Sequence, residues 1–260
     1  MDLNIIYQDS DVLVIDKLAG VVVFPEGNGP VEGTEKTLID YLLEQFPDLK
    51  SVGERPRYGI VHRLDKDTSG ILLVAKTPEA LIFLQKQFSA GAKALADKKN
   101  SRPLDKTLEK RYIALATGVI EEDKSIIHTL IARSKSDPRK QSAHSLNYTD
   151  KKDLREAISE YKVLEKFTDP STPLRASYTL LEVKIKTGRK HQIRCHLAYI
   201  HHPVAGDKLY GFKDSPLPKG LGRQFLHASY LKITSPSGQI KEFHSDLPED
   251  LQNILNNLKK

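Results

Sequence analysis

The stretch HRLDKDTSG, residues 62–70, lies between two short apolar runs and decides how the first part of the chain is expected to fold. The runs Gly59–His62 and Ile71–Lys76 carry β-forming residues, which predicts a strand on each side. The stretch is therefore predicted to form the connection between two strands. Reactive groups are often presented on such connections, because the scaffold holds both ends.

Asp65 is the residue of this stretch best placed to carry chemistry. It lies between Arg63 and Lys66, two cations that favour the ionised form of its carboxyl group. The residues that follow, Thr68–Gly70, are typical of turns. Two interpretations fit this spacing: Asp65 is a reactive carboxylate, or it caps backbone amides in an ordinary charged hairpin loop.

Strand patterns predominate in the rest of the chain. Expected strands are 3–7, 12–16, 110–117, 125–132, 157–166, 178–186, 233–234 and 240–244; expected helices are 38–46, 78–89, 188–198 and 248–258. Thr77 and Thr187 are the predicted caps of the second and third helices. Because the strands do not alternate regularly with helices, the pattern favours an antiparallel-rich α+β fold.

Composition and charge limit the class of protein. The chain has 260 residues, 39% of them hydrophobic, so it can bury a sizeable core and is not a disordered protein. The net charge is +6 and the pI is near 9.1. A basic excess suits a polyanionic partner such as a nucleic acid, and it is equally typical of a soluble, self-repelling surface.

The expected organisation is a single domain spanning residues 1–260, with basic surface loops near 91–106 and 133–155. Each loop is either a solvated insertion or an RNA contact. Cys195 is the only cysteine, which excludes an intrachain disulfide and favours a reducing compartment. Without a leader pattern or an apolar run of membrane-spanning length, we expect a soluble cytoplasmic protein.

The segment TGRKHQIRCHL, residues 187–197, forms a second candidate site. If a helix begins here, its N-terminal amides and neighbouring cations form an anion site. Arg194 can pair with a buried carboxylate through its planar fork. The His and Cys spacing matches no structural zinc pattern, so we expect no metal, with Cys195 a small buried residue.

A third candidate is the run KRYIAL, residues 110–115, which predicts a strand with Tyr112 and Ala114 on one face. Tyr112 is either a core residue with a satisfied hydroxyl group or a ring against which an extruded base packs. Spacing alone favours the core.

Together, these segments resemble the motifs of the RluA-type pseudouridine synthases. The matching motifs, in the family's order, are residues 11–20, 62–70 (central motif), 110–112 (tyrosine motif), 187–197 (arginine motif), 202–211 and 226–228. The resemblance implies the pseudouridine synthase fold, a mixed and mostly antiparallel sheet with flanking helices and a central active-site cleft. It covers the catalytic domain only, so we expect no S4-like RNA-binding domain.

The resemblance also implies a reaction and its residues. Such an enzyme breaks the C1′–N1 bond of uridine, turns the base and rejoins it through C5, which requires neither a cofactor nor a metal. Asp65 would supply the carboxylate at the ribose, by attacking C1′ or by removing the C2′ proton. Arg194 would keep Asp65 ionised, and Tyr112 would pack on the uracil.

The implied partner is a structured RNA, either ribosomal RNA or tRNA, bound by a monomeric protein that does not contact a membrane. Arg63 would help to extrude the nucleotide, while Leu64 and Ile193 would line a dry pocket. Arg189 and His191 are expected to bind substrate.

Two other functions remain open at this point. A nucleoside or glycoside hydrolase would use Asp65 and Asp67 as its carboxylate pair, although Asp67 is only two residues away and Arg194 then has no role. A non-catalytic RNA-binding module on the same fold is the other alternative. Product analysis and an Asp65→Asn variant distinguish the three.

Overall fold

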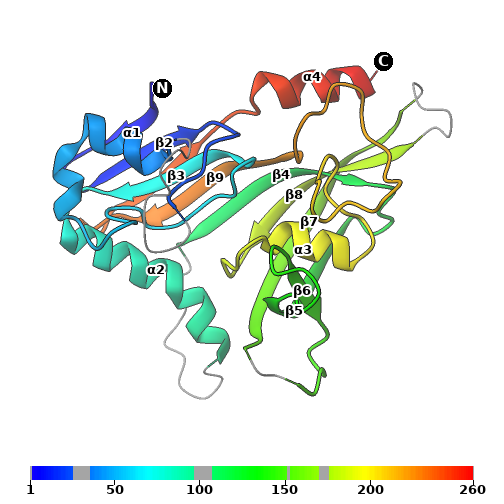
Figure 1. Ribbon diagram of the computed structural model, residues 1–260, viewed down its shortest axis with the longest axis horizontal. Coiled ribbons are helices and arrows are strands. Elements are labelled where there is room, and N and C mark those ends of the chain that lie inside the picture. The colour runs from blue at the N-terminus through cyan, green and yellow to red at the C-terminus, as the bar shows by residue number, and fades with distance from the viewer. Residues whose placement is uncertain (1, 26–35, 97–106, 151–152, 170–175, 260) are drawn as a thin grey trace. The chain divides into compact units, whose positions relative to one another are not determined.

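The computed structural model describes residues 2–25, 36–96, 107–150, 153–169 and 176–259 (Figure 1). Two compact units make up the chain, and neither is a continuous stretch. The first comprises Met1–Ala90, Asp105–Leu108 and Ala228–Asp246; the second comprises Gly91–Leu104, Glu109–His227 and Leu247–Lys260. The single domain expected from the sequence stays a prediction.

The sheet of the first unit has the strand order β1-β2-β3-β9, with β10 on β9. These strands are β1 (Asn4–Gln8), β2 (Val12–Lys17), β3 (Ser69–Ala75), β9 (Leu226–Thr234) and β10 (Ile240–His244). The helices α1 (Leu38–Gln45) and α2 (Pro78–Ala96) lie beside the sheet, and a 3-10 turn, η1 (Pro47–Ser51), follows α1. β2 and β3 are buried along almost their whole length, which explains their continuous apolar sequences.

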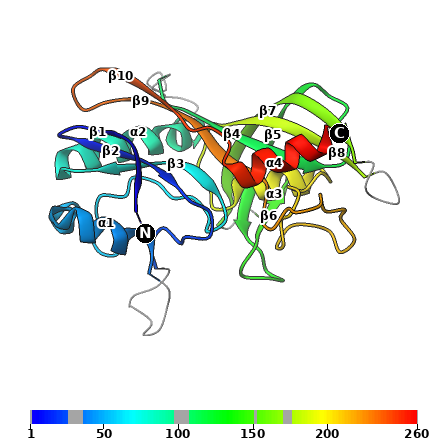
Figure 2. The same cartoon turned by 90° about the horizontal axis from the view of Figure 1, so that it is seen from above.

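The sheet of the second unit has the order β4-β8-β7-β5-β6, and its neighbours are antiparallel. Its strands are β4 (Glu109–Thr117), β5 (Lys124–Arg133), β6 (Gln141–His144), β7 (Arg155–Thr168) and β8 (Ser177–Ile185). Two helices, α3 (Gln192–Tyr199) and α4 (Glu249–Leu258), lie on opposite faces (Figures 1 and 2). α4 packs on Leu115, Tyr178 and Leu180, whereas Cys195 of α3 packs near Ile131 and Ala157.

Most of the expected elements are confirmed. The backbone amide of Ala80 donates a 3.1 Å hydrogen bond to Thr77 Oγ1, so Thr77 caps α2 as predicted. The last helix buries the four residues that share its apolar stripe, Leu251, Ile254, Leu255 and Leu258. No helix of the described residues is both long and apolar enough to cross a membrane.

Two local predictions were wrong. Gly59–His62 is not a strand, since only Ile60 forms an isolated bridge, to Val74. The helix predicted at 188–198 begins only at Gln192, and its N-cap is His191 rather than Thr187. Thr187 Oγ1 instead accepts a hydrogen bond from the backbone amide of Ile158 and donates one to Gln192 Oε1. Because these two hydrogen bonds occupy its hydroxyl group, Thr187 does not cap the helix.

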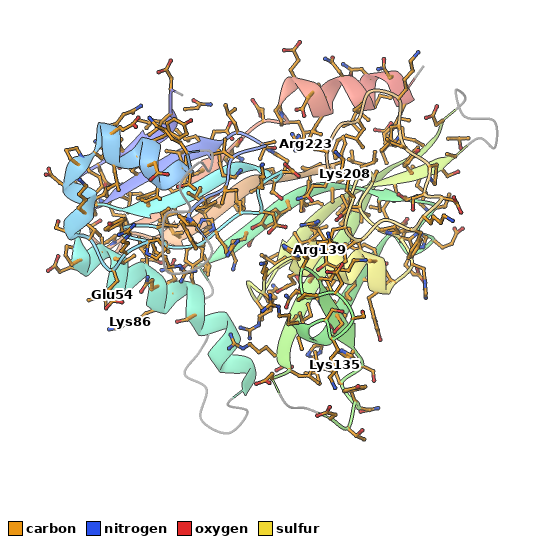
Figure 3. All side chains as sticks on the ribbon, in the orientation of Figure 1. Glu54, Lys86, Lys135, Arg139, Lys208 and Arg223 are labelled. Carbon is orange, nitrogen blue, oxygen red and sulfur yellow. The ribbon has the colours of Figure 1, made fainter. Side chains whose placement is uncertain are left out.

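The two predicted surface loops are partly regular structure. α2 continues to Ala96, because its last turns are rich in alanine, the strongest helix former; residues 97–106 lie outside the described residues. Within 133–155, β6 pairs with the end of β5, and 151–152 lie outside the description. Lys135 and Arg139 lie on the β5–β6 connection (Figure 3) and form ion pairs with Asp150 and Asp137.

Candidate active site

Asp65 lies in the first unit, on the connection between the Ile60 bridge and β3. The backbone amide of Thr68 donates a 3.1 Å hydrogen bond to the Asp65 carbonyl oxygen, which closes a turn. Asp65 is partly exposed, whereas its neighbour Leu64 is buried. The carboxylate is thus presented at the surface by a backbone that is anchored in the core.

Lys17, at the end of β2, stabilises the Asp65 turn through hydrogen bonds to backbone carbonyl oxygens. Its side chain is almost fully buried, and its ammonium group donates hydrogen bonds to the carbonyl oxygens of Leu18, Val21 and Lys66, at 2.7, 2.9 and 3.0 Å. The backbone amide of Gly20 donates to the same Lys66 carbonyl, at 2.9 Å. Two donors therefore fix the residue next to Asp65. The motif at 11–20 contained this lysine, but spacing did not reveal its role.

His62 and Gly70 fix the two ends of the stretch. The Leu73 backbone amide donates to His62 Nε2 at 3.1 Å, so this nitrogen carries no proton, and the ring stacks on Phe88. Gly70 has φ +109°, and a Cβ atom there would lie 2.3 Å from the carbonyl oxygen of Ala228 on β9. Only glycine allows the two strands to approach this closely.

Arg63 lies over an aromatic ring of the same unit. Its guanidinium carbon is 5.2 Å from the centre of the Phe24 ring, and that of Arg57 is 4.9 Å from it. Such cation–π contacts orient a guanidinium group without consuming its hydrogen-bond donors. The Phe24 ring therefore helps to set the orientation of the Arg63 guanidinium group.

Gln192 organises the arginine motif in the second unit. Its Oε1 accepts hydrogen bonds from Thr187 Oγ1 and from the backbone amide of Arg189, while its Nε2 donates to Ile158 O and Ser159 Oγ of β7. These bonds fold residues 187–191 into a loop before α3. His191 adopts φ +54° there, a conformation that non-glycine residues adopt only where contacts hold them.

Arg194 of the arginine motif forms a bidentate ion pair with Asp207. The Nε–Oδ2 and Nη2–Oδ1 distances are 2.6 and 2.9 Å, and the Asp207 side chain is fully buried. Burial opposes ionisation of Asp207, but the hydrogen bonds and charge of Arg194 outweigh it and lower the pKa of the carboxyl group. The backbone amides of Leu209 and Tyr210 also donate to Oδ1.

Tyr210 connects two of the predicted site residues. Its hydroxyl group is 3.1 Å from His191 Nδ1, and the Arg194 guanidinium carbon is 5.1 Å from its ring centre. The hydroxyl also accepts a hydrogen bond from the Gln141 backbone amide. Asp207 and Tyr210 both fall within the family motif at residues 202–211, whose sequence pattern predicted no role for either side chain.

The other predicted residues of this unit are buried or half-buried. Tyr112 on β4 and Ile193 on α3 are buried. Arg189 donates from Nε to the carbonyl oxygen of Glu156 at 3.0 Å. Burial, with some repulsion from Arg189, lowers the pKa of neighbouring Lys110 to about 8. Two basic side chains thus lie close together beside the tyrosine motif.

Cys195 and the neighbouring His196 are both buried in the second unit. Burial raises the pKa of the Cys195 thiol to about 12, as expected of an unreactive core residue. His196, beside it, contacts the hydroxyl groups of Thr129 and Ser159, each at 2.9 Å. Within the described ranges, no group of three or more His, Cys, Asp or Glu residues is arranged to hold a metal ion.

Comparison with known proteins assigns the family. The sequence model described as RNA pseudouridylate synthase matches residues 11–199, which include Asp65, Tyr112 and Arg194. The chain belongs to this family. It is therefore an RNA pseudouridine synthase, an isomerase, as the motifs predicted. The roles of individual side chains stay predictions.

Curated relatives of this pseudouridine synthase extend beyond it. An uncharacterized RNA pseudouridine synthase, YlyB, of Bacillus subtilis (strain 168) is 38% identical over all of this chain and 74% of its own length. The ribosomal large subunit pseudouridine synthase D of Nitrosomonas europaea is 40% identical over 97% of this chain and 64% of its own length. The chain thus spans less than two thirds of that second relative.

Solved structures confirm the α+β pseudouridine synthase fold. Human RNA Pseudouridylate Synthase Domain Containing 1 superposes with a TM-score of 0.68 at 25% identity, covering 97% of this chain and 87% of that one. Human RNA Pseudouridylate Synthase Domain Containing 4 gives the same TM-score at 22% identity, covering 98% and 93%. The central cleft implied by the motifs stays a prediction for this pseudouridine synthase.

Proposed function

We propose that this pseudouridine synthase isomerises specific uridines of large-subunit ribosomal RNA, with Asp65 as its catalytic carboxylate. The observation that carries the proposal is the placement of Asp65 on an anchored turn inside the segment matched by the family model. The names of several relatives, such as the Nitrosomonas europaea enzyme, favour ribosomal RNA over tRNA. We infer a monomer acting in the cytoplasm, as expected from the sequence.

The reaction conserves all atoms of the RNA. The C1′–N1 bond breaks, the uracil turns, and a C1′–C5 bond forms; C5 then loses a proton and N1 gains one. Asp65 would stabilise or capture the ribose at C1′, or remove the C2′ proton. Tyr112 would pack on the base, and Leu64 and Ile193, both buried, would exclude water that could hydrolyse the intermediate.

Arg194 would hold Asp65 ionised while Asp207 holds Arg194. The pair with Asp207 uses Nε and Nη2 of Arg194 and fixes the orientation of the guanidinium group, whose positive charge would favour the ionised form of Asp65. Arg63, Arg189 and His191 would bind the phosphates and bases that flank the target. An Arg194→Met variant should bind RNA but lose turnover, and retained turnover would contradict the role of Arg194.

The test compares Asp65→Asn with Asp67→Asn, a matched change at an exposed neighbour. Transcribed large-subunit ribosomal RNA labelled with tritium at uridine C5 is incubated with each protein. Tritium release with the base retained is expected for the wild type and for Asp67→Asn, and none for Asp65→Asn. Release of free uracil would support the hydrolase, and full activity of Asp65→Asn would overturn the assignment of Asp65.

A further inference from the structure

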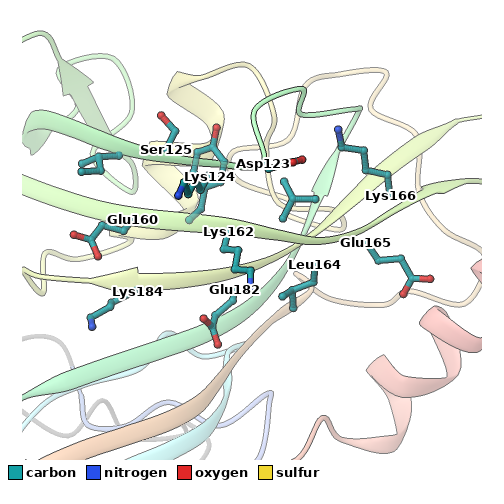
Figure 4. Close-up of a pocket in the computed structure, with 13 residues that line it drawn as sticks. Asp123, Lys124, Ser125, Glu160, Lys162, Leu164, Glu165, Lys166, Glu182 and Lys184 are labelled. Atoms are coloured by element: carbon teal, nitrogen blue, oxygen red, sulfur yellow. The ribbon is translucent and has the colours of Figure 1, made fainter.

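A long groove crosses the sheet of the second unit on the face turned away from α3. Ser159 of β7 contacts Gln192 and His196 of α3. Because side chains alternate along a strand, Glu160 and Lys162 point to the opposite face. There they line a groove with a volume of about 1070 Å³ formed by β5, β7 and β8 (Figure 4). α4 covers another part of this face and leaves the groove open.

Two large apolar side chains that line the groove are exposed to solvent. Ile126 of β5 is 62% exposed, more than any other large hydrophobic side chain of the described residues, and Leu164 of β7 is 46% exposed. Single exposed apolar residues are common on protein surfaces, but their grouping in a concavity is typical of a binding surface. Something with apolar faces is therefore expected to cover Ile126 and Leu164.

The charges of the groove are unevenly paired. Four of its charged residues are in ion pairs with residues outside it: Glu160 with Lys186, Glu165 with Lys259, Glu182 with Arg111, and Lys184 with Glu109. Among the described residues, no ion-pair partner lies within 4.0 Å of Lys124, Lys162, Lys166 or Asp123. The groove is lined by four lysines and four carboxylates, so its formal net charge is zero. Its members without an ion pair are three cations and one anion, which leaves the lysines as the uncompensated charges.

Two of these lysines oppose each other directly. Lys124 of β5 and Lys162 of β7 are cross-strand partners, and like charges in this position destabilise a sheet. Glu182 is the partner of Lys162 on its other side, but its carboxylate lies 3.5 Å from the Arg111 guanidinium group. A bound polyanion would relieve the repulsion between the two lysines.

We infer that this groove binds the ribose–phosphate backbone of the RNA substrate, away from the nucleotide that is modified. The inference rests on the proposed function. Phosphates would lie against Lys124, Lys162 and Lys166, releasing their counterions, and ribose or base faces would cover Ile126 and Leu164. Because the groove and Arg194 lie on opposite faces of one sheet, the RNA must be large enough to reach both.

The first test is a double variant, Lys124→Gln/Lys162→Gln, with Lys50→Gln/Lys86→Gln as the matched control on exposed lysines of the first unit. Binding of transcribed large-subunit ribosomal RNA is measured across a series of salt concentrations. The groove variant should bind about tenfold more weakly at low salt, and the slope of log Kd against log salt should fall by roughly two. The control should keep the wild-type slope.

A second pair of variants separates binding from folding. Lys124→Glu should weaken RNA binding yet raise the midpoint of thermal unfolding, because it replaces a like-charge pair by an opposite-charge pair. Ile126→Ser should also weaken binding, whereas Ile82→Ser, at a similarly exposed site on α2, should not. At saturating RNA, kcat of the groove variants should equal that of the wild type.

The outcomes distinguish this inference from the proposed function. If the wild type forms pseudouridine but the groove variants bind RNA with unchanged affinity and slope, the groove inference is overturned and the proposed function stands. If the wild type forms no pseudouridine in ribosomal RNA, the proposed function fails, whereas reduced binding and salt slope still support the groove. Capture of an acidic protein segment without any change in RNA binding would overturn the RNA assignment.

Discussion

Arg194 and Asp207 meet through two parallel hydrogen bonds, and the carboxylate is entirely removed from solvent. The pair joins α3 to the loop that precedes β9, so a residue of the arginine motif is oriented by a residue 13 positions later. Removing one partner of such a pair is costly, because the other charge stays buried.

Asp207→Asn should therefore lower the free energy of unfolding by about 3 kcal/mol and reduce kcat by more than it changes KM. Asp250→Asn is the matched control, because its ion pair with Arg223 is largely exposed on the Asp side and should contribute less than about 1 kcal/mol. Urea denaturation and steady-state kinetics give the two readouts. Equal losses for the two variants would contradict a special role for Asp207.

Lys17→Met should destabilise the Asp65 turn. The change leaves the carbonyl oxygens of Leu18, Val21 and Lys66 without the ammonium donor they share, at a cost of about 2 kcal/mol. We expect lower stability and lower kcat, measured by urea denaturation and tritium release. Lys50→Met, at an exposed position, should change neither quantity. If Lys17→Met also leaves stability and kcat unchanged, the Asp65 turn does not depend on the Lys17 hydrogen bonds.

Gly70→Ala should be far more damaging than Gly238→Ala. Both glycines have positive φ, +109° and +81°, but a Cβ at Gly70 meets the Ala228 backbone at 2.3 Å, whereas nothing lies within 4 Å at Gly238. We expect a loss of roughly 3 kcal/mol or more at Gly70 and about 1 kcal/mol at Gly238. Thermal and urea unfolding measure both, and similar losses would mean that φ alone decides.

His196 should make the protein sensitive to mild acid. Burial, with a smaller contribution from His128, lowers its pKa from 6.5 to about 4, so the unfolded chain binds the proton more tightly than the native protein. The free energy of unfolding should fall as pH drops from 6.5 to 4, by up to roughly 3 kcal/mol from this group. Urea denaturation at pH 7 and 4.5 tests the window.

His196→Gln provides the control for that prediction, because an amide can keep hydrogen bonds to Thr129 and Ser159 but does not titrate. Its stability should depend less steeply on pH between 6.5 and 4 than that of the wild type. Identical slopes would place the acid sensitivity elsewhere in the protein.

The elements whose burial follows a periodic sequence pattern could be predicted from the sequence. The apolar runs of β2 and β3 and the stripe of α4 are periodic in sequence, so burial of one face specifies each element. The motifs around Asp65, Tyr112 and Arg194 likewise predicted the family, which the comparisons confirm. The roles of these side chains stay predictions, because no comparison tests them.

Contacts between distant residues could not be predicted in the same way. Thr187 has the sequence of a helix cap, yet hydrogen bonds to Ile158 and Gln192 occupy its hydroxyl group. β6 has no apolar alternation, because it is a short, half-buried strand of polar and small residues. Nothing in the local sequence distinguishes Lys17 from a surface lysine, but in the structure its ammonium group contacts three carbonyl oxygens from two loops. Tertiary partners decide each case.

The close packing of Gly70 on β3 against Ala228 on β9 has a consequence for synthesis of the chain. β3 carries the Asp65 turn, yet its neighbour β9 is made more than 150 residues later. On the ribosome, the turn therefore lacks its supporting strand until β9 has emerged. A nascent chain that ends before residue 228 should be unable to complete this sheet, so competence for catalysis is delayed until β9 has been made.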